Sequence, residues 1–228
     1  MMKNTLCLLM CLLLTFSILE ISTAAENSSI VFSKNEDATK KIALTFDDGP
    51  HPRYTERILN ILEKYNIKAT FFVIGVNIEN YPEPLKKIYE GGHEIGNHSY
   101  DHNNEKNLNE ENVRTEIEKC ETLIYETVGV RATLFRPPQG DYGSQVEKIA
   151  SQKNYSIILW SIDTRDWEHS PPQKILKTVS SKLNGGDIIL MHDYVSGTNT
   201  TCEALELIIP TLLSQGYEFV TVSELING

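Results

Sequence analysis

The chain has 228 residues, 40% of them hydrophobic and 23% charged, a composition that is typical of one globular domain and excludes a disordered or fibrous protein. Acidic residues (31) outnumber basic residues (21), so the net charge is −10. Nucleic acids and anionic membrane surfaces are bound by clustered lysine and arginine. We therefore expect no nucleic acid as a partner, and a neutral substrate fits the charge better.

The first residues have the pattern of a secretory signal. Lys3 precedes an apolar run at 6–19, and small residues follow at 22–25, as at the cleavage site of a signal peptide. The apolar run is shorter than the roughly 20 residues that span a bilayer, so we expect no stable membrane span in the mature chain; an uncleaved anchor is the alternative. The sequence predicts a secreted or cell-envelope protein with a signal peptide (1–25), a short polar linker (26–38) and one folded domain (39–228).

Two of the four cysteines, Cys7 and Cys11, lie in the predicted signal peptide. Only Cys120 and Cys202 remain, too few for the disulfide framework of a small secreted domain. They fall on different predicted helices, so we expect both to stay unpaired.

From residue 41 onward, strand-like segments alternate with helix-like segments, which is the pattern of a parallel sheet with crossover helices. The predicted strands begin with the stretch 41–50 and continue at 69–74, 93–96, 133–136, 155–160, 187–191 and 218–222. The predicted helices begin with one capped by Thr55 and continue from 82 to the glycines at 91–92, then at 109–128, 144–152, 172–183 and 201–215, before a turn at 223–226. About seven β–α units result, enough to close a barrel.

The stretch 41–50 ends a buried strand with two adjacent acids, Asp47 and Asp48, in front of a Gly-Pro breaker. Successive side chains of an extended segment point to opposite sides, so one carboxylate can hold a metal while its neighbour faces a substrate. The alternative is a turn in which both carboxylates accept hydrogen bonds from nearby backbone N–H groups. The motifs farther along the chain favour the first interpretation.

Other ionisable side chains, which could bind a metal or transfer protons, lie at the C-terminal ends of predicted strands. They are His98 and His102 after the third strand, Arg136 at the end of the fourth, Asp163 and Asp166 after the fifth, and His192 at the end of the sixth. In a β/α barrel these ends share one face, and active sites are built there. We therefore expect these side chains to meet the two acids in one site.

The histidine pair indicates a metal site. His98 and His102 are four residues apart, so they could face the same way on one helical turn and bind one ion. On its own, such a pair is equally consistent with surface residues. A carboxylate from Asp47 or Asp48 completes a set of two histidines and one carboxylate, which suits zinc, cobalt or ferrous iron.

Five short motifs occur in order: TFDDGP at 45–50, HSYDH at 98–102, RPPQG at 136–140, DTRDW at 163–167 and LMH at 190–192. In this order they resemble the polysaccharide deacetylases with a NodB-homology domain, carbohydrate esterase family 4, over about 41–225. The resemblance implies an α/β fold, a distorted (β/α) barrel with about seven parallel strands, and makes 39–228 a catalytic domain. It implies a metal-dependent hydrolase that removes N-acetyl groups from peptidoglycan or chitooligosaccharide, or O-acetyl groups from xylan. We expect the chain to be a monomer.

The resemblance assigns roles to matching positions. Asp47 is the general base, which takes a proton from water. Arg136 is expected to interact with Asp47. The metal ligands are Asp48, His98 and His102, with zinc as the expected ion and cobalt as an alternative. Such an ion polarises the acetyl carbonyl and lowers the pKa of water.

The remaining roles concern the leaving group and the acetyl pocket. His192 resembles the general acid that protonates the departing sugar nitrogen, and a neighbouring carboxylate, Asp166, raises its pKa. The backbone N–H of Gln139 would donate to the oxyanion. Leu190 and Trp167 would form an apolar notch for the acetyl methyl group, although barrel core explains Leu190 equally well. Family members commonly carry Tyr where this chain has Gln139, which leaves the preferred sugar open.

Two other classes of function share some of these features. A non-catalytic carbohydrate-binding relative would keep the barrel but is expected to lose the base or the acid, whereas Asp47 and His192 are both present. A non-haem iron oxygenase shares the ligand set, but its β-sandwich-type scaffold does not match the alternation of strands and helices. Asp163 keeps two interpretations, contact with substrate or orientation of a loop. Export and the lack of a binding module favour N-acetylated glycans over xylan.

Overall fold

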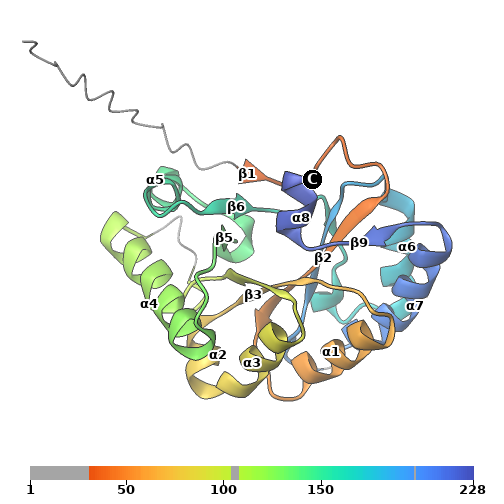
Figure 1. Cartoon of the computed structure of the whole chain (residues 1–228), viewed down its shortest axis with the longest axis horizontal. Helices are drawn as coiled ribbons and strands as arrows, with labels where there is room; N and C mark the ends of the chain where they lie inside the picture. The colour runs from red at the N-terminus through yellow and green to blue at the C-terminus, as the bar shows by residue number, and fades with distance from the viewer. Residues whose placement is uncertain (1–30, 104–107, 198) are drawn as a thin grey trace, which may run out of the picture.

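A computed structural model describes residues 31–103, 108–197 and 199–228. Within these residues the core is one curved sheet of nine strands, and every pairing between the strands is parallel. The strand order is β1-β6-β5-β4-β3-β2-β8-β7, with β9 beside β2. Helices lie around the outside of the sheet (Figure 1). The fold is an α/β distorted barrel, as predicted, with more parallel strands than the seven expected.

The elements alternate along the chain as the sequence pattern indicates. The strands are β1 (Val31–Phe32), β2 (Lys41–Gly49), β3 (Thr70–Val73), β4 (Glu94–Asn97), β5 (Leu134–Phe135), β6 (Ser156–Ile158), β7 (Ile162–Asp163), β8 (Ile188–His192) and β9 (Glu218–Phe219). The helices are α1 (Tyr54–Lys64), α2 (Gly75–Asn80), α3 (Pro82–Glu90), α4 (Glu110–Val128), α5 (Ser144–Gln152), α6 (Pro172–Lys182), α7 (Thr201–Ser214) and α8 (Val222–Asn227). Two short 3₁₀ turns, η2 (Pro138–Gly140) and η3 (Asp166–Glu168), follow β5 and β7.

β2 is the central strand, and both of its faces are buried. Leu44 and Phe46 pack in the larger core, whereas Ala43 belongs to a second, smaller core. A strand covered on both faces is typically apolar along its length, and β2 is apolar from Ile42 to Phe46 except for the buried Thr45. β3 and β8 pair with β2 on its two edges, and the pairing with β8 places Asp47 opposite His192.

Local signals in the sequence set the ends of the helices. α4 starts after Asn109, whose side chain accepts a hydrogen bond of 2.9 Å from the N–H of Asn112, as is typical of a helix N-cap. It ends at Gly129, which has φ 75, a left-handed conformation that glycine adopts without strain. Ile58 and Leu62 of α1 lie one turn apart and are both fully buried, so the apolar stripe of the helix faces the sheet.

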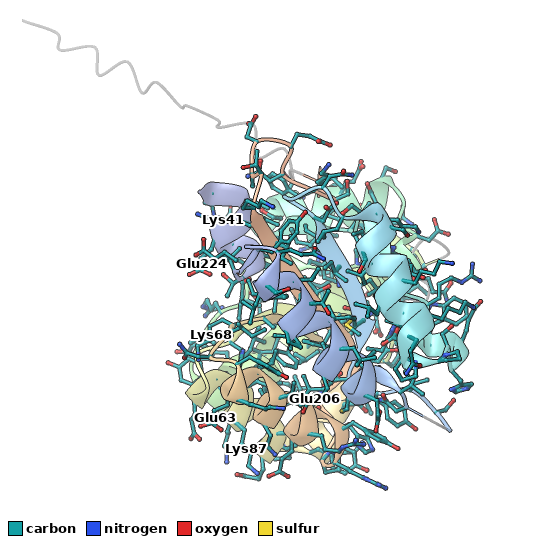
Figure 2. All side chains as sticks on the ribbon, turned by 90° about the vertical axis from the view of Figure 1, so that its right-hand side faces the viewer. Lys41, Glu63, Lys68, Lys87, Glu206 and Glu224 are labelled. Carbon is teal, nitrogen blue, oxygen red and sulfur yellow. The ribbon has the colours of Figure 1, made fainter. Side chains whose placement is uncertain are left out.

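The outer sides of the helices are charged. Figure 2 shows α6 and α7 side by side, with Lys87 and Glu206 at the surface of the molecule. Lys87 pairs with Glu56 of α1, and Glu206 pairs with Lys64 of α1, each at 2.6 Å. Exposed ion pairs of this kind contribute about 0–1 kcal/mol each, so the buried cores dominate stability. None of the described helices is long and apolar enough to cross a membrane.

The structure adds short elements that the sequence pattern does not show, namely β1, β7 and α2. Val31–Phe32 falls in the segment predicted as a linker but pairs with the exposed edge of β6, so the described fold begins before residue 39. The predicted turn at 223–226 lies inside α8, because Thr221 and Glu224 form a capping box that starts a helix. The predicted signal peptide, 1–25, lies outside the described residues.

Candidate active site

The C-terminal ends of the strands surround a hollow of about 370 Å³. Its lining includes eight of the ten predicted site residues, Asp47, Asp48, His98, His102, Gln139, Trp167, Leu190 and His192. The other two, Arg136 and Asp166, are fully buried and contact residues of the lining. The structure therefore brings all ten predicted residues together at one end of the barrel.

Asp47 is held by a buried arginine. Arg136 Nη1 donates to Asp47 Oδ1 at 2.7 Å and to Thr45 Oγ1 at 2.8 Å. Its other nitrogens donate to the carbonyl oxygens of Ile158 (3.1 Å) and Leu159 (3.0 Å). Because a buried ion without a partner is costly, the arginine compensates the charge of Asp47 and fixes its orientation.

Asp48, His98 and His102 form a donor set that fits a divalent ion. One donor atom from each lies within 4.8 Å of the others, and Nε2 of His98 and His102 lie 3.6 and 3.3 Å from Asp48 Oδ1. That oxygen is buried and has no hydrogen-bond partner among the described residues, which is costly unless another group binds it. One carboxylate and two imidazoles leave open the positions that a catalytic metal site needs.

The surroundings of His98 prepare one of its nitrogens for a metal. Nδ1 lies 2.6 Å from the carbonyl oxygen of Arg136. Since a carbonyl only accepts, Nδ1 carries the hydrogen and Nε2 keeps its lone pair on the side of Asp48. Burial lowers the pKa of His98 against the opposing charges of Asp47 and Asp48. The ring is therefore neutral, which is the form that binds metals.

The two histidines do not lie on a helical turn, as their spacing suggested. His98 directly follows β4, and the residues up to His102 form an irregular loop in which Ser99 (φ 66) and His102 (φ 63) are left-handed. Ser99 Oγ accepts a hydrogen bond of 3.1 Å from the N–H of His102, which folds the loop back and places the ring centroids 5.0 Å apart. Asp48 also has a positive φ of 74, and such conformations cluster at functional sites.

His192, at the end of β8, is bound by Asp166. Its Nδ1 lies 2.8 Å from Asp166 Oδ1, and its backbone N–H donates to Oδ2 at 2.8 Å. Thr201 Oγ1 also donates to Oδ2, at 2.7 Å. Burial alone lowers the pKa of His192, but the hydrogen bond and charge of Asp166, with the charges of Asp47 and Asp48, outweigh it and raise the pKa to about 9. His192 is therefore protonated near neutral pH.

Apolar groups line another part of the hollow. Leu190 is 4% exposed and Trp167 is 46% exposed. Trp160 also lines the hollow, although the sequence motifs did not single it out. Its place at the end of the fifth predicted strand is the signal that could have found it. A Cβ at Gly140 would lie 2.6 Å from the Trp160 ring, so this glycine lets the turn with Gln139 (φ 62) pack closely against it.

Two acids beside the site have structural contacts. Asp163 lines the hollow, and its Oδ1 accepts a hydrogen bond of 2.8 Å from the N–H of Arg165, so it orients the loop before η3. Asp193, which the motifs did not single out, is fully buried; its Oδ2 accepts from Thr55 Oγ1, and burial raises its pKa to about 7. A Cβ on Gly49 would overlap the Asp193 carboxyl group, so the turn after β2 packs directly against the loop after β8.

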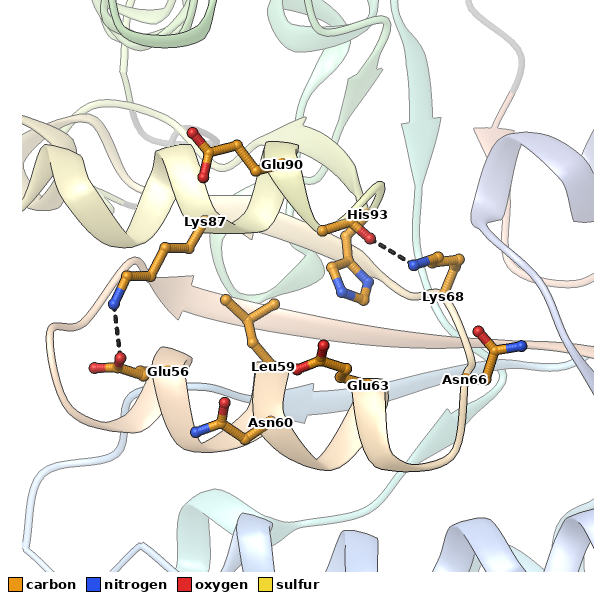
Figure 3. Close-up of a pocket in the computed structure, with 10 residues that line it drawn as sticks. Glu56, Leu59, Asn60, Glu63, Asn66, Lys68, Lys87, Glu90 and His93 are labelled. Carbon is orange, nitrogen blue, oxygen red and sulfur yellow. Dashed lines mark hydrogen bonds and ion pairs between the residues drawn. The ribbon is translucent and has the colours of Figure 1, made fainter.

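A wider hollow of about 630 Å³ lies outside the sheet, between α1 and α3 (Figure 3). At its rim Lys87 pairs with Glu56, and Lys68 Nζ donates to the carbonyl oxygen of Gly91 at 2.6 Å. His93 is buried there, and burial, with the charge of Lys68, lowers its pKa to about 4. The cations of this hollow are already engaged, so we assign the chemistry to the hollow at the strand ends.

Known proteins share the fold and much of the sequence of this chain. A family model described as polysaccharide deacetylase matches residues 34–158. The chain is 40% identical over 190 residues to the peptidoglycan-N-acetylglucosamine deacetylase of Bacillus cereus, which covers 82% of this chain and 89% of that protein. The solved structure of the Bc1960 peptidoglycan N-acetylglucosamine deacetylase superposes with a TM-score of 0.83 and 36% identity, covering 88% of this chain and 94% of that one.

A CE4 family pseudoenzyme from Bacillus anthracis is also similar, with a TM-score of 0.81 and 34% identity over 87% of this chain and 69% of that one. Catalytic activity must therefore be inferred from the site residues themselves. The family match covers more than half of the chain, and the curated relative is similar along most of both sequences. The chain belongs to the polysaccharide deacetylase family.

Proposed function

We propose that this protein is a metal-dependent hydrolase that removes N-acetyl groups from the N-acetylglucosamine units of a glycan, peptidoglycan or chitooligosaccharide, and releases acetate. The observation that carries the proposal is the position of Asp47 opposite His192 across β2 and β8, beside the donor set of Asp48. A base and an acid are thus both present, each with its own buried partner. A non-catalytic member of the family is expected to lack one of them.

The donor set beside Asp47 is the proposed metal site. Asp48, His98 and His102 would hold a divalent cation, and their ligand types suit zinc first and cobalt second. When bound, such a cation polarises an acetyl carbonyl and lowers the pKa of water. Two hydrogen bonds hold the proposed ligands in position. Asn77 donates one of 2.8 Å to the backbone carbonyl of Asp48, and the carbonyl oxygen of Arg136 fixes the His98 ring.

Asp47 is the proposed general base. Arg136 occupies its Oδ1, whereas its Oδ2 lies 3.6 Å from His98 Nε2. Oδ2 is therefore the oxygen that takes a proton from the water attacking the acetyl carbon. Because Arg136 compensates the negative charge, Asp47 is ready to accept that proton at the start of each cycle.

His192 is the proposed general acid. Asp166 holds its Nδ1 hydrogen, so Nε2 donates its proton to the sugar nitrogen as the carbon–nitrogen bond breaks and the amine leaves uncharged. In the same step the backbone N–H of Gln139 donates to the oxyanion of the acetyl group. Leu190 and Trp167, on the apolar side of the hollow, receive the methyl group.

Location and organisation follow from the same proposal. Residues 1–25 act as a signal peptide, and the chain works outside the cell or in the cell envelope as a monomer. Support comes from the Bacillus cereus relative, whose name gives peptidoglycan as its substrate. The catalytic domain is 39–228 together with β1, whose pairing with β6 makes it part of the sheet.

The test is acetate release by the purified chain, first stripped of metal with a chelator and then reloaded with zinc or cobalt. Peptidoglycan, N-acetylchitooligosaccharide and acetylxylan are offered in parallel, and mass spectrometry locates the lost acetyl group. We expect release from the first two, only after reloading. Release from acetylxylan alone would make the chain an O-acetyl esterase, and no release from any of the three would refute a catalytic function.

A further inference from the structure

Four rings gather outside the hollow, on the loops that follow β2 and β8 and at the junction of α2 and α3. His51 and Tyr194 are stacked, with ring centroids 4.9 Å apart and an interplanar angle of 12°. The ring centroids of Tyr54 and Tyr81 lie 4.9 and 6.2 Å from that of His51. Tyr81 and Tyr194 are 41% and 39% exposed, so parts of both rings are open to solvent. We call these four residues the aromatic cluster.

Hydrogen bonds hold the centre of the aromatic cluster in place. His51 Nδ1 accepts from the N–H groups of Arg53 and Tyr54, both at 3.2 Å. The N–H of His51 donates to Thr55 Oγ1 at 2.7 Å, and Thr55 donates in turn to Asp193 on the loop after β8. Burial, with the charge of Arg53, lowers the pKa of His51, so the ring is uncharged. The His51 ring is therefore fixed before any ligand arrives and gives Tyr194 a rigid partner to stack on, which reduces the entropy lost on binding.

The aromatic cluster adjoins the catalytic hollow along the chain. His51 is three positions after Asp48, and Tyr194 is two positions after His192. At about 3.8 Å per residue, the corresponding Cα atoms lie within roughly 11 and 8 Å of each other. None of the four rings lines the hollow itself. These separations are comparable to the length of one or two sugar units, so the aromatic cluster is close enough to meet a glycan that extends beyond the hollow.

We infer that the aromatic cluster is a second glycan-binding subsite, on which a pyranose ring next to the reacting sugar stacks against Tyr194 and Tyr81. This inference rests on the proposed function. A pyranose has a face of C–H groups that packs on the faces of aromatic rings. Contiguous exposed aromatic groups beside a polar site are typical of binding surfaces. The uncharged His51 suits a neutral sugar.

The subsite makes affinity depend on the length of the glycan. Calorimetric titration with the monosaccharide N-acetylglucosamine and with its hexamer measures Kd in an Asp47→Asn background, in which turnover is slow. Tyr194→Ala and Tyr81→Ala should each raise the Kd for the hexamer by on the order of tenfold and leave that for the monosaccharide unchanged. Tyr194→Phe keeps the ring face and should bind like the parent. Tyr89→Ala removes a tyrosine of similar exposure, 47%, outside the aromatic cluster and should change neither Kd.

The outcomes separate this inference from the proposed function. Equal losses of affinity for the monosaccharide and the hexamer, or no loss for the hexamer, would overturn the subsite. Tyr81→Ala and Tyr194→Ala alter different loops, so one of them decides if the other fails to fold. Acetate release is measured separately on the unaltered chain. Binding that depends on glycan length, without acetate release, would support the subsite and refute the proposed function. Acetate release with a Kd that does not change with glycan length would refute the subsite alone.

Discussion

Arg136 Nη1 lies 2.7 Å from Asp47 Oδ1, and the two residues are 0% and 3% exposed. Arg136 follows β5 and Asp47 lies on β2, which are separated in the sheet by β3 and β4. The ion pair therefore crosses the inside of the curved sheet rather than joining neighbouring strands. The Arg136–Asp47 ion pair is therefore part of the buried interior and also part of the candidate active site.

The Arg136–Asp47 pair predicts a test of stability. Arg136→Met should lower the free energy of unfolding by about 3–5 kcal/mol, because it leaves the Asp47 carboxylate buried without a partner. Adding Asp47→Asn removes that charge, so the double variant should regain part of the loss. Denaturation by urea measures both changes. A single Arg136→Met protein as stable as the unaltered chain would show that the pair does not hold the barrel together.

The two adjacent acids should behave differently. Asp47→Asn removes the proposed base and should reduce the rate by on the order of 10²-fold to 10⁴-fold while an ion stays bound. Asp48→Asn should weaken binding of the ion itself, because it removes a ligand. Metal analysis and acetate release on both variants decide the assignment. If Asp47→Asn lost the metal and Asp48→Asn kept it, the two roles would be reversed.

The histidines of the donor set should be needed for metal and activity together. His98→Ala and His102→Ala each remove one of three protein ligands, so both should lose the zinc and the acetate release of the reloaded protein. His169→Ala, an exposed histidine outside the donor set, is the control and should keep both. Metal content after dialysis gives the first readout. Full activity of the double alanine variant after chelation would exclude a role for the metal.

His192 predicts the pH dependence of activity and stability. The proposed acid works protonated, so the rate should fall as pH rises through about 9, the raised pKa of His192, or somewhat lower when a cation is bound nearby. Because this pKa is above its ordinary 6.5, the His192–Asp166 contact stabilises the fold fully below 6.5 and loses that contribution as pH rises through 9.

Asp166→Asn tests the origin of this pKa. It removes the hydrogen-bonded charge that raises the pKa of His192, whereas burial still lowers it, so the alkaline limb of the pH–rate profile should move to lower pH. His192→Ala should abolish the limb altogether. NMR titration of the His192 ring measures the pKa directly. An alkaline limb at the same pH in Asp166→Asn would show that another group controls it.

The cysteines should remain thiols. Cys120 Sγ donates to the carbonyl oxygen of Val73 at 3.3 Å, and burial raises the pKa of Cys202 to about 11. Both side chains are buried, on α4 and α7, and neither is in a disulfide. Thiol titration of the mature protein should therefore detect both after denaturation without a reductant and neither before it. Detection of neither after denaturation would contradict the placement of the two helices.

Local signals explain why much of this molecule can be predicted from its sequence. A mostly apolar run stops before Asp47 in β2 and before His192 in β8, so the ends of both strands were predicted to within one residue. Asn109 and Gly129 mark the two ends of α4 in the same way. In a parallel sheet with crossover helices, strand ends share a face, and this rule alone gathers residues that are far apart in the chain.

The parts that could not be predicted depend on contacts between distant segments. β1 and β7 have two residues each, too few for any periodicity to show. The spacing of His98 and His102 indicated a helical turn, but the loop is shaped by left-handed residues that no local pattern announces. Asp193 packs against Gly49, which lies far away in sequence. No motif in the sequence indicated that Asp193 would be buried.

The register between β2 and β8 has a consequence for engineering. Neighbouring strands are about 4.8 Å apart, so the backbone spacing between Asp47 and His192 is set by the sheet, whereas Gln139 and Tyr194 stand on turns outside it. Side-chain substitutions at these two positions leave the base and acid in register. A library confined to positions 139 and 194 therefore explores new glycans while Asp47, His192 and Arg136 stay in place.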